Sequence, residues 1–254
     1  VVIDNSSAFR MDPEVPLVVP EVNPQAILKH KGIIANPNCS TIIMVMALKP
    51  IYDLAKIKRV IVSTYQAVSG AGKEGIDELD AQVREHSEGR EMTANILPSA
   101  SAEKHYPIAF NLIPQIDVFC DNLYTKEEMK MVNETKKIME DYEMRITATT
   151  IRVPVYRSHS ESVNIELEKE VDLGVMREAL AKFPGVTVQD DPSKQEYPMP
   201  LYTSEKDDVY VGRLRRDESC EKSYNMWVVG DQIRKGAALN TLQIAETMIK
   251  NGWI

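Results

Sequence analysis

The chain has 254 residues, 43% of them hydrophobic and 27% charged, so it can close one large core or two smaller ones. Its formal net charge of −8 argues against nucleic acid as a partner, because a phosphodiester backbone selects for a basic surface. No window approaches the roughly 20 apolar residues of a membrane span, and no secretory leader is recognisable. We therefore expect a soluble, cytoplasmic protein that contacts no membrane.

The cysteines support a reducing compartment. Cys39, Cys120 and Cys220 are odd in number, far apart and without metal-ligand spacing, so we predict free thiols and no metal site. The first residues, 1–7, form an apolar run that ends in turn formers, which predicts a buried strand. Because no initiator Met precedes this run, we expect the chain to begin within a fold and to be part of a longer protein.

Two strands and one helix are predicted between residues 15 and 55. Residues 15–22 are apolar but contain two prolines, which predicts a short edge or extended strand. A strand over residues 32–35 stops at an Asn-Pro-Asn turn. Residues 40–55 crowd apolar side chains on more than one helical face, which predicts a buried helix entered through Asn38 or Cys39.

The remainder of the chain mixes both periodicities. Residues 58–67 predict a strand that runs through a glycine-rich turn into a helix over residues 74–85, and residues 88–104 predict a loop. Later elements are expected at residues 127–139 (helix), 145–153 and 162–167 (strands), 171–182 (helix), 209–215 and 224–229 (strands) and 237–249 (helix). Consecutive strands in the second half favour an α/β protein whose catalytic domain has a mixed, largely antiparallel sheet with helices on one face.

Cys39 lies at the junction between a predicted strand and a predicted helix. At the start of a helix, free backbone N–H groups and the helix dipole favour a thiolate and lower the thiol pKa. The same N–H groups could hold an oxyanion after the thiolate attacks a carbonyl. A buried structural cysteine is the alternative, and position alone leaves both interpretations open.

Two more residues near a predicted strand end could carry chemistry. His159 follows the strand that ends at Pro154 and is predicted on a loop, where it is either a general base or a solvated residue. Arg152 is flanked by Ile151 and Val153, and an arginine in such a strand is costly to bury without an anion. A carboxylate-binding arginine fits this position.

These segments together resemble the aspartate-semialdehyde dehydrogenase family. The resemblance rests on Asn-Pro-Asn-Cys-Ser-Thr at residues 36–41, Arg-Val-Pro at 152–154 and His-Ser at 159–160. Supporting stretches lie at residues 63–72, 110–117, 127–131 and 235–238. Related acyl-phosphate reductases surround their cysteine differently, with Gly-Cys-Tyr-Pro in the glutamyl-phosphate branch and Ser-Cys-Thr-Thr-Asn in glyceraldehyde-phosphate dehydrogenases, and neither motif occurs in this chain.

The resemblance implies a role for each matching residue. Cys39 would be the acyl-forming nucleophile, His159 the acid/base and Gln66 the amide that orients the intermediate. Arg152 would clamp the substrate α-carboxylate, for which its fork of N–H donors is suited. Glu127 would pair with the α-ammonium group.

A phosphate site is implied at Lys130, Arg10 and Asn38. Glu127 and Lys130 are three residues apart on a predicted helix, so both can face one pocket. From the residues alone, a plain surface ion pair would be the preferred interpretation of this pair.

NADP is the cofactor that the resemblance implies, with Ser69, Gly70 and Asn240 at its nicotinamide end. The family's Gly-rich turn, which cradles the cofactor diphosphate, is not found in the 254 residues. This is the largest departure from the family. Two smaller ones, Ser158 before the histidine and Asp-Gln at residues 231–232, lie outside the core chemistry.

The implied architecture is a glyceraldehyde-3-phosphate-dehydrogenase-like catalytic domain plus a remnant of a Rossmann domain. The expected parts are a dinucleotide-binding remnant (1–38), a catalytic and dimerisation domain (39–230) and a C-terminal helix that returns to the first part (231–254). The chain would form a homodimer or homotetramer. Without the Gly-rich turn, we expect substrate binding and acylation but slow turnover with NADPH.

The implied reaction is the NADP-dependent reductive dephosphorylation of β-aspartyl phosphate to aspartate β-semialdehyde, through a thioester on Cys39. This reaction belongs to the biosynthesis of lysine, threonine, methionine and isoleucine. Two alternatives stay open at this point: a non-catalytic dimerisation and substrate-binding fragment of that enzyme, and a related acyl-phosphate reductase.

Overall fold

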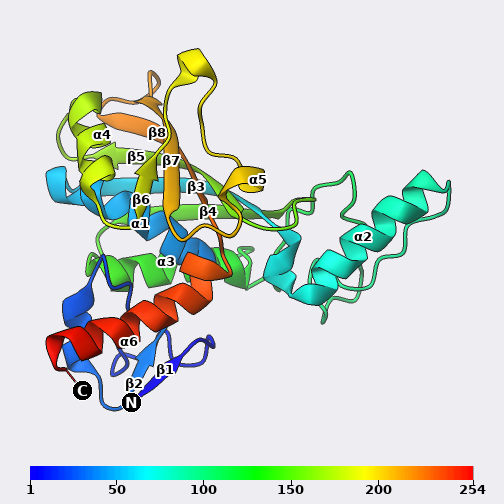
Figure 1. The fold of residues 1–254 in the computed structure, drawn as a ribbon, viewed down its shortest axis with the longest axis horizontal. Helices are drawn as coiled ribbons and strands as arrows, with labels where there is room; N and C mark the ends of the chain where they lie inside the picture. The colour runs from blue at the N-terminus through cyan, green and yellow to red at the C-terminus, as the bar shows by residue number, and fades with distance from the viewer. Residues whose placement is uncertain (254) are drawn as a thin grey trace.

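The computed structural model describes residues 1–253, which contain a two-stranded and a six-stranded sheet (Figure 1). The strands are β1 (Val2–Asp4), β2 (Ile33–Ala35), β3 (Ile57–Gln66), β4 (Arg145–Arg152), β5 (His159–Leu167), β6 (Val186–Val188), β7 (Val209–Arg216) and β8 (Ser223–Gly230). The large sheet has the order β4-β3-β5-β8-β7-β6. Its β3–β4 and β6–β7 pairs are parallel and the other three are antiparallel, which confirms the predicted mixed sheet.

The described part of the chain contains six α-helices. They are α1 (Cys39–Leu54), α2 (Lys73–Ser87), α3 (Lys126–Met139), α4 (Leu173–Lys182), α5 (Pro200–Thr203) and α6 (Leu239–Asn251). α1 is the central helix, because it contacts α3, α4 and four strands, and its apolar side chains fill the main core. α2 lies apart on an arm that extends away from the sheet (Figure 1).

The two ends of the chain meet in a second, smaller core. Strands β1 and β2 are parallel and pack with α6, whose Ile244 and Met248 join Ile34 and Val18 there. Figure 1 shows this unit beneath the large sheet, on the side where α1 and α3 lie. None of the helices in the described part of the chain combines the length and apolar character that a membrane crossing demands.

The helices that bear site residues begin at strong caps. The Asn38 side chain accepts a hydrogen bond from the Thr41 N–H at 3.2 Å, which fixes Cys39 as the first residue of α1. α3 begins with a capping box, in which Thr125 and Glu128 each accept from the other's backbone N–H. Both helix starts are therefore held rigidly.

Strand direction gathers three predicted site residues at one edge of the large sheet. β3 and β4 are parallel and in register at Gln66 and Arg152, so both residues lie where their strands end. β5 runs antiparallel to β3 and starts at the same edge with His159. Topology alone therefore brings together residues that are as many as 93 positions apart in the sequence, from Gln66 to His159.

Most of the predicted elements are confirmed within a few residues, and two predictions are wrong. His159 is the first residue of β5 and is fully buried, so it does not lie on a loop. Residues 15–22 form no strand beyond a single bridge from Leu17 to Ala35, because the prolines interrupt the pairing. Strand β6 was not predicted, since three residues are too short to show a period.

Candidate active site

Cys39 occupies the junction between β2 and α1 and is half-buried. Beside it lies Gly236, in a π-helical turn over Arg234–Ala238 that leads into α6. A Cβ atom at position 236 would lie 2.9 Å from the Cys39 Cβ, closer than two carbon atoms can pack. Only glycine lets this turn approach the cysteine, which accounts for a glycine in the stretch at residues 235–238.

The pKa of the Cys39 thiol is raised to about 12, because burial and the Glu127 carboxylate outweigh the lowering effects of Arg152 and Ser40. The start of the helix does lower this pKa, through hydrogen bonding to Ser40, but the net lowering that was expected is not found. That argument considered the helix dipole but not the desolvation of a thiolate in a closed site. Cys39 rests as a thiol, so its thiolate has to form together with proton transfer.

Removing the Glu127 charge should make Cys39 more reactive. We expect Glu127→Gln to increase the rate of Cys39 alkylation several-fold at pH 7.5, because one of the two causes that raise the thiol pKa is lost. Limited iodoacetamide labelling with peptide mapping measures this, with the exposed Cys220 as internal reference. An unchanged ratio of Cys39 to Cys220 labelling would contradict the assignment of Glu127 as a cause.

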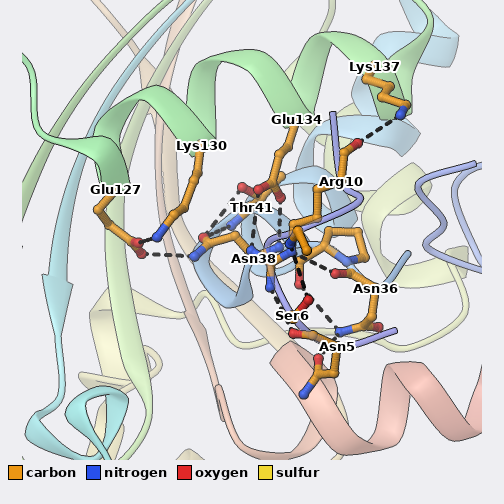
Figure 2. A network of polar contacts seen from close by, with 12 residues as sticks. Asn5, Ser6, Arg10, Asn36, Asn38, Thr41, Glu127, Lys130, Glu134 and Lys137 are labelled. Carbon is orange, nitrogen blue, oxygen red and sulfur yellow. Dashed lines mark hydrogen bonds and ion pairs between the residues drawn. The ribbon is translucent and has the colours of Figure 1, made fainter. Parts of the chain in front are cut away.

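Glu127 is the centre of a buried polar network, part of which Figure 2 shows. Its Oε1 accepts hydrogen bonds from Asn38 at 3.0 Å and from Gln66 at 3.2 Å. Its Oε2 accepts from Lys130 at 3.2 Å, and the Lys130 ammonium also contacts Asp117 at 3.0 Å. Because Glu127 is only 5% exposed, the pair with Lys130 is not a plain surface ion pair. Both side chains do lie in one site, as their spacing predicted.

Arg152 and His159 lie side by side next to Gly70. A Cβ atom at position 70 would be 2.6 Å from Arg152 Nη1 and 3.2 Å from His159 Cε1. Arg152 is 3% exposed, donates from Nη1 to the Ala67 carbonyl at 2.7 Å, and has no partner for Nε among the described residues. An arginine in this state has donors left for a carboxylate.

His159 is held in one protonation state. Its Nδ1 accepts a hydrogen bond from the Ala67 N–H at 3.0 Å, so the proton of the neutral ring lies on Nε2. Burial, and secondarily the Arg152 charge, lowers the pKa of His159 well below its ordinary value. The ring is therefore neutral near pH 7, and Nε2, which has no partner within residues 1–253, is a free donor.

Two of the three predicted phosphate-binding residues, Arg10 and Asn38, bind one carboxylate that the sequence did not single out, Glu134. Arg10 donates from Nη1 to Glu134 at 3.3 Å, and the Asn38 backbone N–H donates to it at 2.7 Å. Lys130 lies one turn earlier on the same helix (Figure 2). The available signal was spacing, since Glu127, Lys130 and Glu134 follow at i, i+3 and i+7 and share one face of α3.

A second acidic residue missed by sequence reasoning is Glu161. It is fully buried on β5, two residues after His159 and on the same face, and neither carboxylate oxygen has a partner in the described chain. Burial raises the pKa of Glu161 well above its ordinary range. Glu161, like Arg152, is a charged residue type within an apolar strand, so the sequence offered the same signal for both.

The predicted cofactor residues differ in their surroundings. Gly70 is exposed beside Arg152 and His159, and the neighbouring Ser69 accepts a hydrogen bond from the Gln232 amide. Asn240 is fully buried and its amide donates to Val18 and Asn36. Its oxygen accepts from Lys235 at 3.0 Å, so every polar atom of Asn240 already has a protein partner.

Glycine at position 70 allows the backbone to lie directly against Arg152 and His159, where a side chain would clash with Arg152. The contact predicted for Asn240 stays a prediction, and it requires one of these protein hydrogen bonds to be exchanged. No three or more His, Cys, Asp or Glu side chains in the part of the chain described are arranged to hold a metal ion.

Comparison with known proteins agrees with this geometry. Residues 48–235 match the family model of the semialdehyde dehydrogenase dimerisation domain, and residues 1–30 match that of the semialdehyde dehydrogenase NAD binding domain. Aspartate-semialdehyde dehydrogenase of Aquifex aeolicus is 57% identical over 256 residues, which span 100% of this chain and 74% of that protein.

Solved structures give the same result. The crystal structure of aspartate semialdehyde dehydrogenase II complexed with ASA from Vibrio cholerae has a TM-score of 0.92 at 47% identity, over 98% of this chain and 72% of that one. The enzyme with NADP from Candida albicans has a TM-score of 0.74 at 24% identity, over 100% of this chain and 72% of that one, and shows the fold alone.

The mixed sheet, the strand–cysteine–helix junction and the match over residues 48–235 define a semialdehyde dehydrogenase. The identity of 57% across the whole chain is more specific than this match. The chain belongs to the aspartate-semialdehyde dehydrogenase family.

Proposed function

We propose that the chain carries out the reductive dephosphorylation of β-aspartyl phosphate to aspartate β-semialdehyde, with NADP as its cofactor. The observation that carries this proposal is the convergence of Cys39, Gln66, Glu127, Arg152 and His159 at one edge of the sheet. A nucleophile, a proton donor and fixed charges for both ends of an amino acid meet there. The product feeds the biosynthesis of lysine, threonine, methionine and isoleucine.

The substrate is oriented by two charged side chains. Arg152 keeps one donor on Ala67 and directs its remaining N–H groups to the α-carboxylate. Glu127 accepts the α-ammonium group as a charge-assisted partner. These two anchors place the β-carbonyl at Cys39, while the phosphoryl group faces Arg10 and Lys130.

Bond changes at the β-carbonyl are assisted by this chain's own residues. The Cys39 sulfur forms the thioester bond as the bond from the carbonyl carbon to the phosphate oxygen breaks, and the thiol proton passes to the departing phosphate, which leaves as hydrogen phosphate. The His159 Nε2–H donates to the oxyanion that develops on the carbonyl oxygen, since the Ala67 N–H keeps the ring proton on Nε2. The Gln66 amide, held by Thr64 at 2.9 Å and by Glu127, orients the acyl group.

NADPH, when bound, supplies the hydride that reduces the thioester to the aldehyde. Gly70 and Ser69 support this assignment, because Gly70 lies directly against Arg152 and His159 and has no side chain to come between them and a bound ring. The match of residues 1–30 to an NAD binding domain supports it independently. The contribution of Gly70 and Ser69 is to admit the nicotinamide ring beside the acyl group and to exclude water from the thioester.

Three further features belong to the proposal. The chain is divided into a dinucleotide-binding part (1–38), a catalytic and dimerisation part (39–230) and a returning helix (231–254), which the separate core of β1, β2 and α6 supports. It assembles as a homodimer or homotetramer, as the match to a dimerisation domain model supports. Its three free cysteines support a cytoplasmic location.

The reaction is tested with purified chain, β-aspartyl phosphate and NADPH by following loss of NADPH absorbance and formation of the aldehyde. Glutamyl phosphate and 1,3-bisphosphoglycerate serve as competing substrates. Preference for the aspartyl substrate supports the proposal. Preference for either other acyl phosphate would instead favour a related acyl-phosphate reductase.

A methyl group at position 70 should impair this reaction. We expect Gly70→Ala to lower kcat/KM by about 100-fold, because the new Cβ displaces Arg152 and crowds His159, and small misplacements of reacting groups are costly. The backbone at Gly70 is not in the left-handed region, so the melting temperature should change little. Wild-type kinetics in this variant would show that the close packing of Gly70 against Arg152 and His159 does not matter for the reaction.

A further inference from the structure

Glu134 stands between the two elements that supply the proposed phosphate site. It is 1% exposed, and its two oxygens serve different partners. Oε1 faces Arg10 at 3.3 Å, and Oε2 accepts the Asn38 backbone N–H at 2.7 Å (Figure 2). One oxygen therefore pairs with Arg10, a predicted phosphate-binding residue. The other accepts a hydrogen bond from the backbone just before Cys39.

A cavity of about 210 Å³ opens beside this carboxylate. Its polar lining includes Arg10, Lys126, Lys130 and Ser7, together with Glu134. Three cations and a hydroxyl around one hollow are the groups that bind a tetrahedral oxyanion. Glu134 is the one carboxylate in this lining, so a dianion that enters the cavity faces it directly.

The charges at the cavity explain why Glu134 matters. Glu134 neutralises Arg10, and Glu127 and Asp117 accept from Lys130, so most of the positive charge is already paired. An entering dianion is repelled by an ionised Glu134, and the repulsion is stronger in a buried site than in water. Arg10 cannot pair fully with both anions.

Because the two oxygens of Glu134 have different partners, protonation of one can release Arg10 while the other keeps the Asn38 N–H. A proton on Oε1 removes the charge that holds Arg10 and turns that oxygen into a donor. Oε2 can still accept the Asn38 N–H, so the cap of α1 stays intact. The Arg10 guanidinium also donates to the Asn36 and Asn5 carbonyls, at 2.9 and 3.2 Å, which hold it at the cavity after it leaves Glu134.

We propose that Glu134 is a positioning residue that occupies Arg10 until an oxyanion binds, and that oxyanion binding is coupled to the uptake of one proton by Glu134. This inference rests on the proposed function, because it takes the cavity at Arg10 and Lys130 as the phosphate site. It adds that release of phosphate returns the proton and re-forms the Arg10–Glu134 pair.

The surroundings of Glu134 bring its pKa into a range in which proton uptake can be measured. Burial raises the pKa of Glu134 to about 6, with a further contribution from Glu127, against the lowering effects of Arg10 and the Asn38 N–H. The other cations near it, Lys126, Lys130 and Lys137, are all on α3. Lys130 is held by carboxylates, which raise its pKa despite burial, so it stays charged through neutral pH.

Lys137 does not share this carboxylate. Its ammonium group donates to the backbone carbonyls of Arg10, Asp12 and Val15, at 2.7 to 2.8 Å. Burial lowers the pKa of Lys137 from its usual value, although Asp12 and Glu134 oppose this. Glu134 is thus the group at this cavity that changes charge on crossing pH 6.

Inorganic sulfate is the probe, because it carries the same two charges throughout the range from mildly acidic to mildly basic pH. Calorimetric titration of the chain should show sulfate affinity weakening by roughly 50-fold from pH 5.5 to 8.0, as expected when binding needs a proton on a group that titrates near pH 6. At pH 7, titrations in two buffers of different ionisation heat should reveal the uptake of close to one proton.

Glu134→Gln should bind sulfate with little pH dependence, bind it more tightly than wild type at pH 8.0, and take up no proton. Glu140→Gln is the matched control, since Glu140 directly follows α3 and pairs with Lys29 at the exposed surface. It should behave like wild type. The proton count on the wild-type chain tests the coupling even if Glu134→Gln does not fold.

Two outcomes separate this inference from the proposed function. If sulfate binds, is lost in Arg10→Ala, and shows neither pH dependence nor proton uptake, the phosphate site stands and the role of Glu134 is wrong. If sulfate binds at no pH, the phosphate site is wrong and the role of Glu134 falls with it.

Discussion

Cys39→Ser is expected to lower kcat by about 10⁴-fold or more, since loss of a nucleophile removes the covalent route and leaves only binding and electrostatic effects. A serine hydroxyl at the start of α1 cannot be ionised by the neutral His159 ring, which already carries its proton on Nε2. Substrate affinity should change little, because Arg152 and Glu127 remain in place. Steady-state kinetics and substrate titration measure the two effects separately.

Cys220→Ser is the control for this variant, because Cys220 is exposed and far from the sheet edge that gathers the site. It should retain wild-type turnover. Comparable activity in Cys39→Ser and Cys220→Ser would exclude Cys39 as the nucleophile.

Arg152→Lys is expected to lower kcat/KM for the aspartyl substrate by about 100-fold, the cost of roughly one charge-assisted hydrogen bond. In the structure, Arg152 holds the Ala67 carbonyl with Nη1 while its other donors stay free. A single lysine ammonium can take the place of one of these interactions but not of both. The melting temperature should fall by only a few degrees, since the side chain remains buried on β4.

Arg145→Lys gives the matched comparison on the same strand. Arg145 is exposed at the other end of β4 and pairs with Glu166 at 3.2 Å, so its replacement should leave kinetics unchanged. Equal effects of the two substitutions would mean that Arg152 acts through the strand and does not bind the substrate carboxylate.

Local sequence signals predicted a site residue correctly where a charged side chain interrupts an apolar segment. Arg152 was predicted as an anion-binding residue because an arginine in an apolar strand needs a partner, and it is indeed buried with free donors. The start of α1 at Cys39 followed from the Asn-Pro-Asn turn and the cap at Asn38. The strand and helix periods placed most elements, since long amphipathic or apolar segments carry the strongest pattern.

The sequence could not reveal what depends on the assembled site. The pKa of Cys39 is raised by burial and by Glu127, which is 88 residues away in the sequence, and these effects outweigh the lowering expected at the helix start. Glu134 looked like one of several acids on an amphipathic helix, and only the fold brings it to Arg10. His159 was predicted on a loop because the proline turn after β4 precedes it by only a few residues. In the structure it is already the first residue of β5.

The role of Cys39 is tested most directly by mass spectrometry of the chain after brief incubation with β-aspartyl phosphate and acid quenching, without NADPH. We predict an aspartyl adduct on the peptide that contains Cys39, removable by hydroxylamine as a thioester is, and none on Cys120 or Cys220. Turnover by a chain that forms no adduct at Cys39, or an adduct on either of the other cysteines alone, would contradict the account.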